Sequence, residues 1–145
     1  MPQETRECRL FVYGTLRQGE AQHALLAGAS LLGVSSTIPA FHLIDVGPYA
    51  ALVRGGTTAV SGELYSVGLQ TRRAIDIERQ VPILFTRETI ELADGTSADA
   101  YLLSSDQVRG RRRLAHGDWK KRFSRGISPH AGGAWVAWAR GRWSK

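Results

Sequence analysis

The sequence has a single cysteine, Cys8, and no apolar run that approaches the roughly 20 residues needed to cross a bilayer. A lone cysteine excludes an internal disulfide framework and is typical of a reducing compartment. Residues 1–7 are polar and lack the apolar stretch of a secretory signal. We therefore expect a cytoplasmic protein with no membrane partner.

Several classes of catalytic motif are also missing. The histidines His23, His42, His116 and His130 lie far apart without the spacing of metal ligands, and one cysteine cannot complete a zinc set. There is no Gly-x-Ser-x-Gly element, no phosphate-binding Lys-Ser/Thr loop and no dinucleotide fingerprint. Cys8 precedes the first predicted strand and has no nearby base in the sequence. We expect no metal and no cofactor.

What is present is typical of a globular protein: 145 residues, 43% hydrophobic and 22% charged. We predict a single domain over residues 1–145, with a core at about 9–103 and a basic, Trp-containing C-terminal extension at 104–145. The net charge of +6 is concentrated in this extension. Such a tail could bind nucleic acid, form a solvated face, or face an acidic small molecule. No recognisable nucleic-acid motif accompanies the charge.

The stretch Arg9–Gly19, RLFVYGTLRQG, is the centre of the functional prediction. It begins as a buried strand and breaks at Gly14, and residues 20–27 then show helical spacing of apolar positions. A strand that gives way to a helix leaves backbone N–H groups without internal partners. Because Gly14 has no Cβ, a ligand could approach the main chain there. This corner could hold a carboxylate, a phosphate or a developing oxyanion, or it could be an ordinary tight turn.

The rest of the chain alternates strands with few helices. A helix is predicted over 69–80, and Asp94-Gly95 predicts a hairpin turn between alternating segments. Asp118 is expected to cap a short helix. The pattern favours an α+β fold, a small mixed β-barrel or bent sheet with short flanking helices. The predicted strands cover residues 9–13, 31–34, 38–44, 49–54, 59–67, 83–92 and 99–103.

Two regions carry carboxylates that could transfer protons. Asp76 and Glu78 lie shortly before a predicted strand, and Glu63 interrupts an otherwise apolar one. An acid among apolar segments can have its pKa raised toward neutrality, which suits general acid–base catalysis. From spacing alone, a charged pair of this kind lies more often on the surface than in an active site.

Three pieces of sequence taken together resemble the gamma-glutamylcyclotransferase superfamily, which includes AIG2-like and YtfP-like proteins. They are Val12-Tyr13-Gly14-Thr15-Leu16-Arg17, then Gly62-Glu63-Leu64-Tyr65, and then Glu78 seven residues before Phe85. The likeness runs from about Leu10 to Leu103. Gly117-Asp118-Trp119 also resembles an element near the C-terminus of some bacterial relatives.

The resemblance implies a small mixed β-barrel and an enzyme that cyclises a γ-glutamyl group to 5-oxoproline, releasing an amine or amino acid. It implies Glu78 as the general acid/base. The substrate-binding residues it implies are Tyr13, Gly14, Thr15, Leu16 and, on a later strand, Tyr101. Arg17 is a further candidate for holding a carboxylate, although it could equally be solvated.

Two departures from the family pattern surround Glu78. Arg79 follows it where relatives have Gly, and Asp76 lies two residues before it where they have Asp three before. A relative that binds γ-glutamyl compounds without turning them over is therefore an alternative, as is a nucleic-acid-binding accessory. A homodimer remains open.

Overall fold

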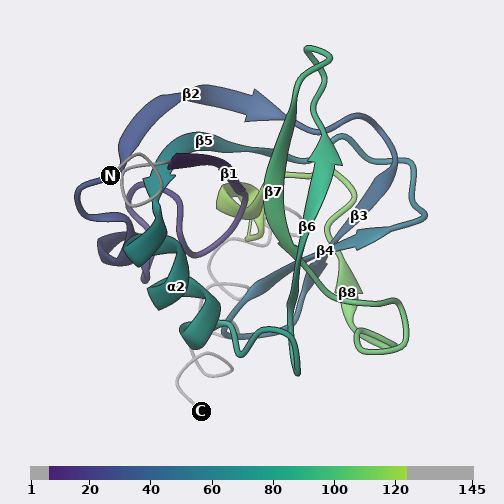
Figure 1. The fold of residues 1–145 in the computed structure, drawn as a ribbon. Helices are drawn as coiled ribbons and strands as arrows, with labels where there is room; N and C mark the ends of the chain where they lie inside the picture. The colour runs from purple at the N-terminus through teal and green to yellow at the C-terminus, as the bar shows by residue number, and fades with distance from the viewer. Residues whose placement is uncertain (1–6, 124–145) are drawn as a thin grey trace, which may run out of the picture.

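The computed structural model describes residues 7–123, which form a mixed β-sheet with one α-helix and two short 3-10 helices (Figure 1). Within this range, no helix combines the length and the apolar character that crossing a bilayer requires. The elements in chain order are β1 (Glu7–Val12), η1 (His23–Leu26), β2 (Ser30–Ser36), β3 (Phe41–Asp45), β4 (Ala50–Arg54), β5 (Ser61–Gly68), α2 (Leu69–Glu78), β6 (Thr86–Glu91), β7 (Ser97–Leu102), β8 (Arg112–Arg113) and η2 (Trp119–Lys121).

The strands form one curved sheet in the order β2-β5-β1-β7-β4-β3-β8, with β6 paired to β7. Most pairs are antiparallel, but β7 lies parallel to both β1 and β4. The α-helix, α2, lies to one side of the sheet (Figure 1). The α+β class is confirmed. The barrel is not, because the described strands leave β2 and β8 at open ends of the sheet.

Both faces of the central strands are buried, which explains their nearly continuous apolar sequences. Phe11 packs into one core cluster, and its neighbours Leu10 and Val12 pack into the other. Strand β4 divides in the same way, with Leu52 on the first face and Val53 on the second. This alternation follows from the two-residue repeat of a strand. The sheet is therefore a wall between two cores.

Most predicted elements are present with shifted ends. The hairpin is confirmed: β6 and β7 pair antiparallel from Thr86↔Leu102 to Glu91↔Ser97. The predicted helix over 69–80 is α2, which ends at Glu78. The strand expected from Ile83 begins only at Thr86, and Ile83 is 85% exposed.

The helix predicted over residues 20–27 is wrong in kind. Only His23–Leu26 is helical, as a 3-10 turn, and turns occupy the residues before it. An isolated helix of eight residues is marginal in water. Here its first residues form side-chain contacts instead: Glu20 pairs with Lys120 at 3.2 Å. The expected corner is thus a chain of turns and not a helix N-terminus.

Residues 104–123 contribute to the core, so buried packing extends beyond the predicted limit at Leu103. Leu114 and Trp119 are 0% and 2% exposed, and the Leu114 amide donates to the carbonyl oxygen of Leu43 at 2.8 Å. Asp118 caps η2 as predicted, accepting a hydrogen bond from the Lys120 amide at 3.0 Å. The remainder of the basic extension, 124–145, lies outside the described residues.

Gly117 allows a close approach between this C-terminal segment and the residues before β5. Its φ is +74°, and a Cβ there would collide with the carbonyl oxygen of Ala59. We expect Gly117→Ala to lower the free energy of unfolding by about 2 kcal/mol or more, from backbone strain plus the collision. Gly28→Ala is the matched control, because its φ is +87° with no atom within 4 Å of the added Cβ. Urea unfolding should show a smaller loss for Gly28→Ala, and equal losses would contradict the close-approach argument.

Candidate active site

The turn after β1 is pressed directly against β4. A Cβ on Gly14 would lie 2.6 Å from the Cβ of Ala50, so the glycine is required by the protein's own packing. The side of Gly14 that was expected to admit a ligand is therefore filled by Ala50. The Gly14 carbonyl accepts a hydrogen bond from the Arg17 amide at 3.0 Å, which closes the turn.

Tyr13 anchors this turn from beneath. Its hydroxyl donates to the Tyr101 carbonyl oxygen at 2.6 Å and accepts from the Leu52 amide at 3.1 Å, joining β1 to β7 and β4. Burial raises the pKa of Tyr13 to about 12, although the positive charge of Arg79 and the Leu52 amide oppose the rise. The phenol is thus a neutral, buried structural group beside the pocket.

Thr15 and Leu16 both line the pocket. In the described part of the chain, neither amide N–H donates a hydrogen bond to another backbone group. The Thr15 hydroxyl donates to Gln22 Oε1 at 2.7 Å and accepts from an Arg79 guanidinium nitrogen at 3.0 Å. Thr15 and Leu16 are 6% and 3% exposed. The turn therefore offers main-chain donors in a nearly dry setting.

Arg79, directly after α2, extends its side chain into this region and is 5% exposed. Besides Thr15, its guanidinium donates to Gln22 Oε1 at 2.7 Å and to Glu78 Oε1. Its Cζ lies 4.6 Å from the ring centroid of Tyr49 and 5.6 Å from that of Phe85. A guanidinium held by two rings and three oxygen acceptors is a firmly placed cation.

Glu78, the last residue of α2, belongs to the same network. Its Oε2 accepts from the Tyr49 hydroxyl at 2.8 Å and from the Gln22 side-chain amide, while Oε1 accepts from Arg79. Its side chain is 27% exposed, so solvent reaches the carboxylate. Burial, together with the hydrogen bond to Glu78 and its negative charge, raises the pKa of Tyr49, so this phenol stays neutral and donates.

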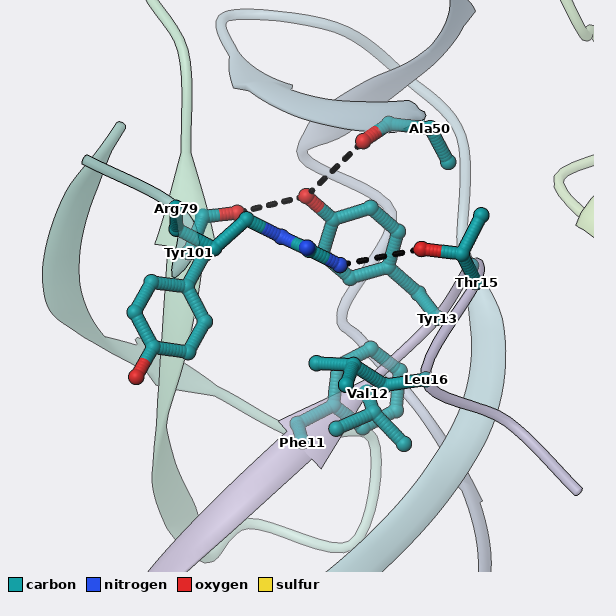
Figure 2. A pocket seen from close by; sticks show the side chains of 9 residues that line it. Phe11, Val12, Tyr13, Thr15, Leu16, Ala50, Arg79 and Tyr101 are labelled. Atoms are coloured by element: carbon teal, nitrogen blue, oxygen red, sulfur yellow. Dashed lines mark hydrogen bonds between the residues drawn. The ribbon is translucent and has the colours of Figure 1, made fainter. Parts of the chain in front are cut away.

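A narrow pocket lies between the turn and Arg79 (Figure 2). Its volume is about 10 Å³, which is room for roughly one water molecule. Figure 2 shows the Arg79 guanidinium reaching across the Tyr13 ring to the Thr15 hydroxyl. The lining residues are Phe11, Val12, Tyr13, Gly14, Thr15, Leu16, Ala50, Arg79 and Tyr101.

Tyr101 lines this pocket with its backbone, while its phenol belongs to a second cluster. Its hydroxyl donates to Asp76 Oδ1 at 2.6 Å, and Arg87 donates to Asp76 Oδ2 at 2.6 Å. Figure 2 shows the Tyr101 hydroxyl pointing away from the Tyr13 hydroxyl. Burial and the adjacent Asp76 carboxylate raise the pKa of Tyr101 well above its usual range. Asp76 thus holds α2 to the sheet.

Arg17 and Glu63 lie apart from the pocket, in a third cluster. They are 8% and 5% exposed, and Arg17 Nε lies 3.6 Å from Glu63 Oε2. Arg17 also donates to Asp118 Oδ1 at 2.8 Å. Glu63 Oε1 accepts from the Gln18 amide at 3.0 Å and from the Tyr65 hydroxyl at 2.9 Å. The structure therefore gives Arg17 a role in holding the turn in position and does not bring it to the pocket.

Sequence reasoning missed three side chains of the pocket network. Gln22 was assigned to a helix, Tyr49 to a strand end, and Arg79 was noted only as a departure from the family pattern. The signal available was Arg79 itself, since a charged residue at the end of a helix beside a candidate acid needs a partner. Among residues 7–123, no group of histidine, cysteine or acidic side chains is arranged to hold a metal ion.

Comparisons with family models, with curated proteins and with solved structures all point to the same family. The model of the family described as "Gamma-glutamyl cyclotransferase, AIG2-like" matches residues 10–121. A Vibrio cholerae protein provisionally named a gamma-glutamylcyclotransferase is 41% identical over 113 residues, covering 78% of this chain and 96% of its own. Mouse gamma-glutamylaminecyclotransferase is 28% identical over 92 residues, covering 57% of this chain and 62% of its own. The solution structure of ytfP from Escherichia coli has a TM-score of 0.60 and 31% identity, covering 79% and 98% of the two chains.

Tyr13→Phe should cost about 1–3 kcal/mol of unfolding free energy, because it leaves the Tyr101 carbonyl and the Leu52 amide buried without this partner. The variant should also change the response to alkali. An unfolded tyrosine releases its proton near pH 10, whereas folded Tyr13 holds it to about pH 12. Wild-type stability should therefore fall as pH rises from 10 to 12, and less steeply in the variant. Urea unfolding at pH 8, 10 and 11 measures both effects, and identical pH slopes would contradict the assignment.

Proposed function

We propose that this chain, which belongs to the AIG2-like gamma-glutamylcyclotransferase family, converts a γ-glutamyl group into 5-oxoproline and releases the attached amine. The proposal rests mainly on one observation. The Glu78 carboxylate and the turn at Thr15 are joined through Gln22, which donates to the former and accepts from the latter. A titratable acid and a bend with free main-chain donors therefore share one network.

The proposed reaction is an intramolecular aminolysis. With the substrate's α-amine as the free base, its nitrogen forms a bond to the γ-carbonyl carbon, and the bond from that carbon to the leaving nitrogen breaks. The attacking nitrogen gives up a proton, and the leaving nitrogen takes one. Because the nucleophile belongs to the substrate, the protein must supply a ring-like pose, a proton carrier and stabilisation of the developing charge.

Glu78 is proposed as the proton carrier. Its carboxylate is partly exposed and surrounded by groups that donate hydrogen bonds, Tyr49 and Gln22 among them. These donors keep the side chain oriented. When one of them moves away, the carboxylate oxygen that it leaves can accept a hydrogen bond from the substrate amine. An acid that first accepts a proton from the attacking nitrogen and then returns it to the leaving nitrogen serves both halves of the reaction.

The turn after β1 is proposed as the binding site for substrate oxygens. The Thr15 and Leu16 amides donate to no other backbone group within residues 7–123, and both residues are buried beside the pocket, where a hydrogen bond to an anion is stronger than in water. Gly14 and Tyr13 hold this turn in place through Ala50 and the neighbouring strands. We propose Tyr101 as a wall of the site rather than a hydrogen-bonding group, since its hydroxyl is occupied by Asp76.

The substrate class proposed here is a γ-glutamyl amine or a γ-glutamyl amino acid. The mouse relative's name supports an amine as one kind of leaving group. The lone cysteine, half-buried Cys8, fits a reducing compartment, and we propose a cytoplasmic location.

A second candidate function is binding without turnover. The observation that favours it is the ion pair between Arg79 and Glu78, which occupies one oxygen of the proposed proton carrier. A non-catalytic relative would be stabilised against thermal unfolding by γ-glutamyl compounds, yet would release no 5-oxoproline from them.

Glu78→Gln should keep the fold and reduce 5-oxoproline formation from γ-glutamyl amides by at least about 10²-fold, the usual effect of losing a general acid–base. The glutamine preserves the shape and the acceptor oxygen of the side chain but cannot carry the proton. Chromatographic detection of 5-oxoproline measures the rate, and circular dichroism checks the fold.

The matched control is Glu88→Gln on β6. Glu88 pairs with Arg54 at 3.0 Å on an exposed face and should leave the rate unchanged. Equal rates in the wild type and in Glu78→Gln would show that another group transfers the proton. Stabilisation by the ligand without product in the wild type would favour the binding function.

A further inference from the structure

We propose that Arg79 recognises the α-carboxylate of the γ-glutamyl substrate and is a specificity-determining residue of this site. The inference rests on the proposed function and adds a charged contact to it. The family resemblance implies glycine after the glutamate, whereas this chain has Arg79 there. Its basis is the position, burial and partners of the guanidinium.

The guanidinium is already where a substrate carboxylate would need it. It lines the same pocket as Thr15 and Leu16, whose amides donate to no other backbone group within residues 7–123. Its hydrogen bond to the Thr15 hydroxyl, 3.0 Å, places it within reach of any anion bound at that turn. A carboxylate between the turn and Arg79 would accept hydrogen bonds from both sides.

The remaining contacts hold the guanidinium plane without using all its hydrogen-bonding capacity. The Tyr49 and Phe85 rings, which contact each other, lie with their centroids 4.6 and 5.6 Å from its Cζ, so its position does not depend on any single acceptor. A guanidinium has five N–H donors, and the neutral acceptor Gln22 Oε1 can be exchanged for a charged one. A carboxylate is the stronger partner, since both members of that pair are ionised.

The charges of the site also match those of the substrate. Arg79 and Glu78 form an ion pair at the end of α2. An α-amino acid head group carries a carboxylate next to an ammonium. Pairing the carboxylate with Arg79 and the amine with Glu78 exchanges one ion pair for two, and it places the amine against the proposed proton carrier. When the substrate carboxylate pairs with Arg79, the ion pair between Arg79 and Glu78 is broken and Glu78 can accept the amine.

The other buried arginine near the turn, Arg17, is not placed to bind the substrate α-carboxylate. Arg17 donates to Asp118 at 2.8 Å and lies 3.6 Å from Glu63, and it does not line the pocket. The pocket volume of about 10 Å³ further requires that a head group displace part of the present network. Arg79 is the cation whose acceptors the substrate can replace.

The test compares two inert probes that differ only at the carboxylate, 5-oxoproline and its carboxamide. Binding to the full chain is measured by calorimetry or NMR titration. We expect the wild type to bind 5-oxoproline about 10- to 100-fold more tightly than the carboxamide, the range for a hydrogen bond to a charged group. Neither probe can be turned over, so the measurement does not depend on activity.

Two variants assign this preference to Arg79. Arg79→Gln should reduce the ratio of the two dissociation constants to within about 3-fold, and Arg79→Lys, which keeps the charge but loses the fork, should give an intermediate ratio. The matched control is Arg109→Gln, an arginine with a 79% exposed side chain, which should retain the wild-type ratio. Thermal unfolding checks that each variant is folded. The wild-type comparison stands even if Arg79→Gln does not fold.

The outcomes separate this inference from the proposed function. A wild type that binds both probes equally, or an Arg79→Gln variant that keeps the full preference, overturns the role of Arg79 while leaving 5-oxoproline formation intact. A wild type with an Arg79-dependent preference that forms no 5-oxoproline from γ-glutamyl amides overturns the catalytic proposal alone. Failure of the wild type to bind either probe overturns the inference.

Discussion

A buried guanidinium needs acceptors, and this requirement organises the centre of the molecule. Arg79 is removed from solvent, so its charge must be compensated by Glu78 and its N–H groups by Thr15 and Gln22. Each of these acceptors comes from a different part of the chain. The arginine therefore joins the end of α2 to the turn after β1 and to the segment that precedes η1.

The sheet, which is buried on both faces of its central strands, holds these parts of the chain together. Strands β1 and β4 both lie next to β7. The turn after β1 therefore meets the first residue of β4, where Gly14 contacts Ala50. The Tyr13 hydroxyl ties the two strands to β7 through hydrogen bonds to the Tyr101 carbonyl oxygen and the Leu52 amide, and Gly14 lets the turn rest on Ala50. The polar network then lies on a rigid apolar base, which is the arrangement that holds a site in a defined geometry.

Much of this fold follows from local sequence rules, and the parts that do not follow depend on distant contacts. The β6–β7 hairpin and the Asp118 cap are encoded within a few residues and are confirmed. The helix expected over residues 20–27 is largely replaced by turns, since its polar side chains bond to residues far along the chain. Pairing of Arg17 with Asp118, 101 positions away, is likewise invisible to spacing rules. The turn became a candidate through the break at Gly14 and Glu78 through the resemblance, whereas the contacts of Arg79 appear only in the folded structure.

The ion pairs of Arg17 with Glu63 and Asp118 connect the C-terminal segment to the turn beside the pocket. Lys120 also contacts the Gln18 carbonyl oxygen, so the last described turn is fastened to the loop that continues from the pocket. A substitution that removes the Asp118 or Lys120 side chain would therefore loosen the loop that follows the pocket without changing a residue that lines it. Residues 118–120 thus support the pocket from outside it, through their contacts with residues 17 and 18.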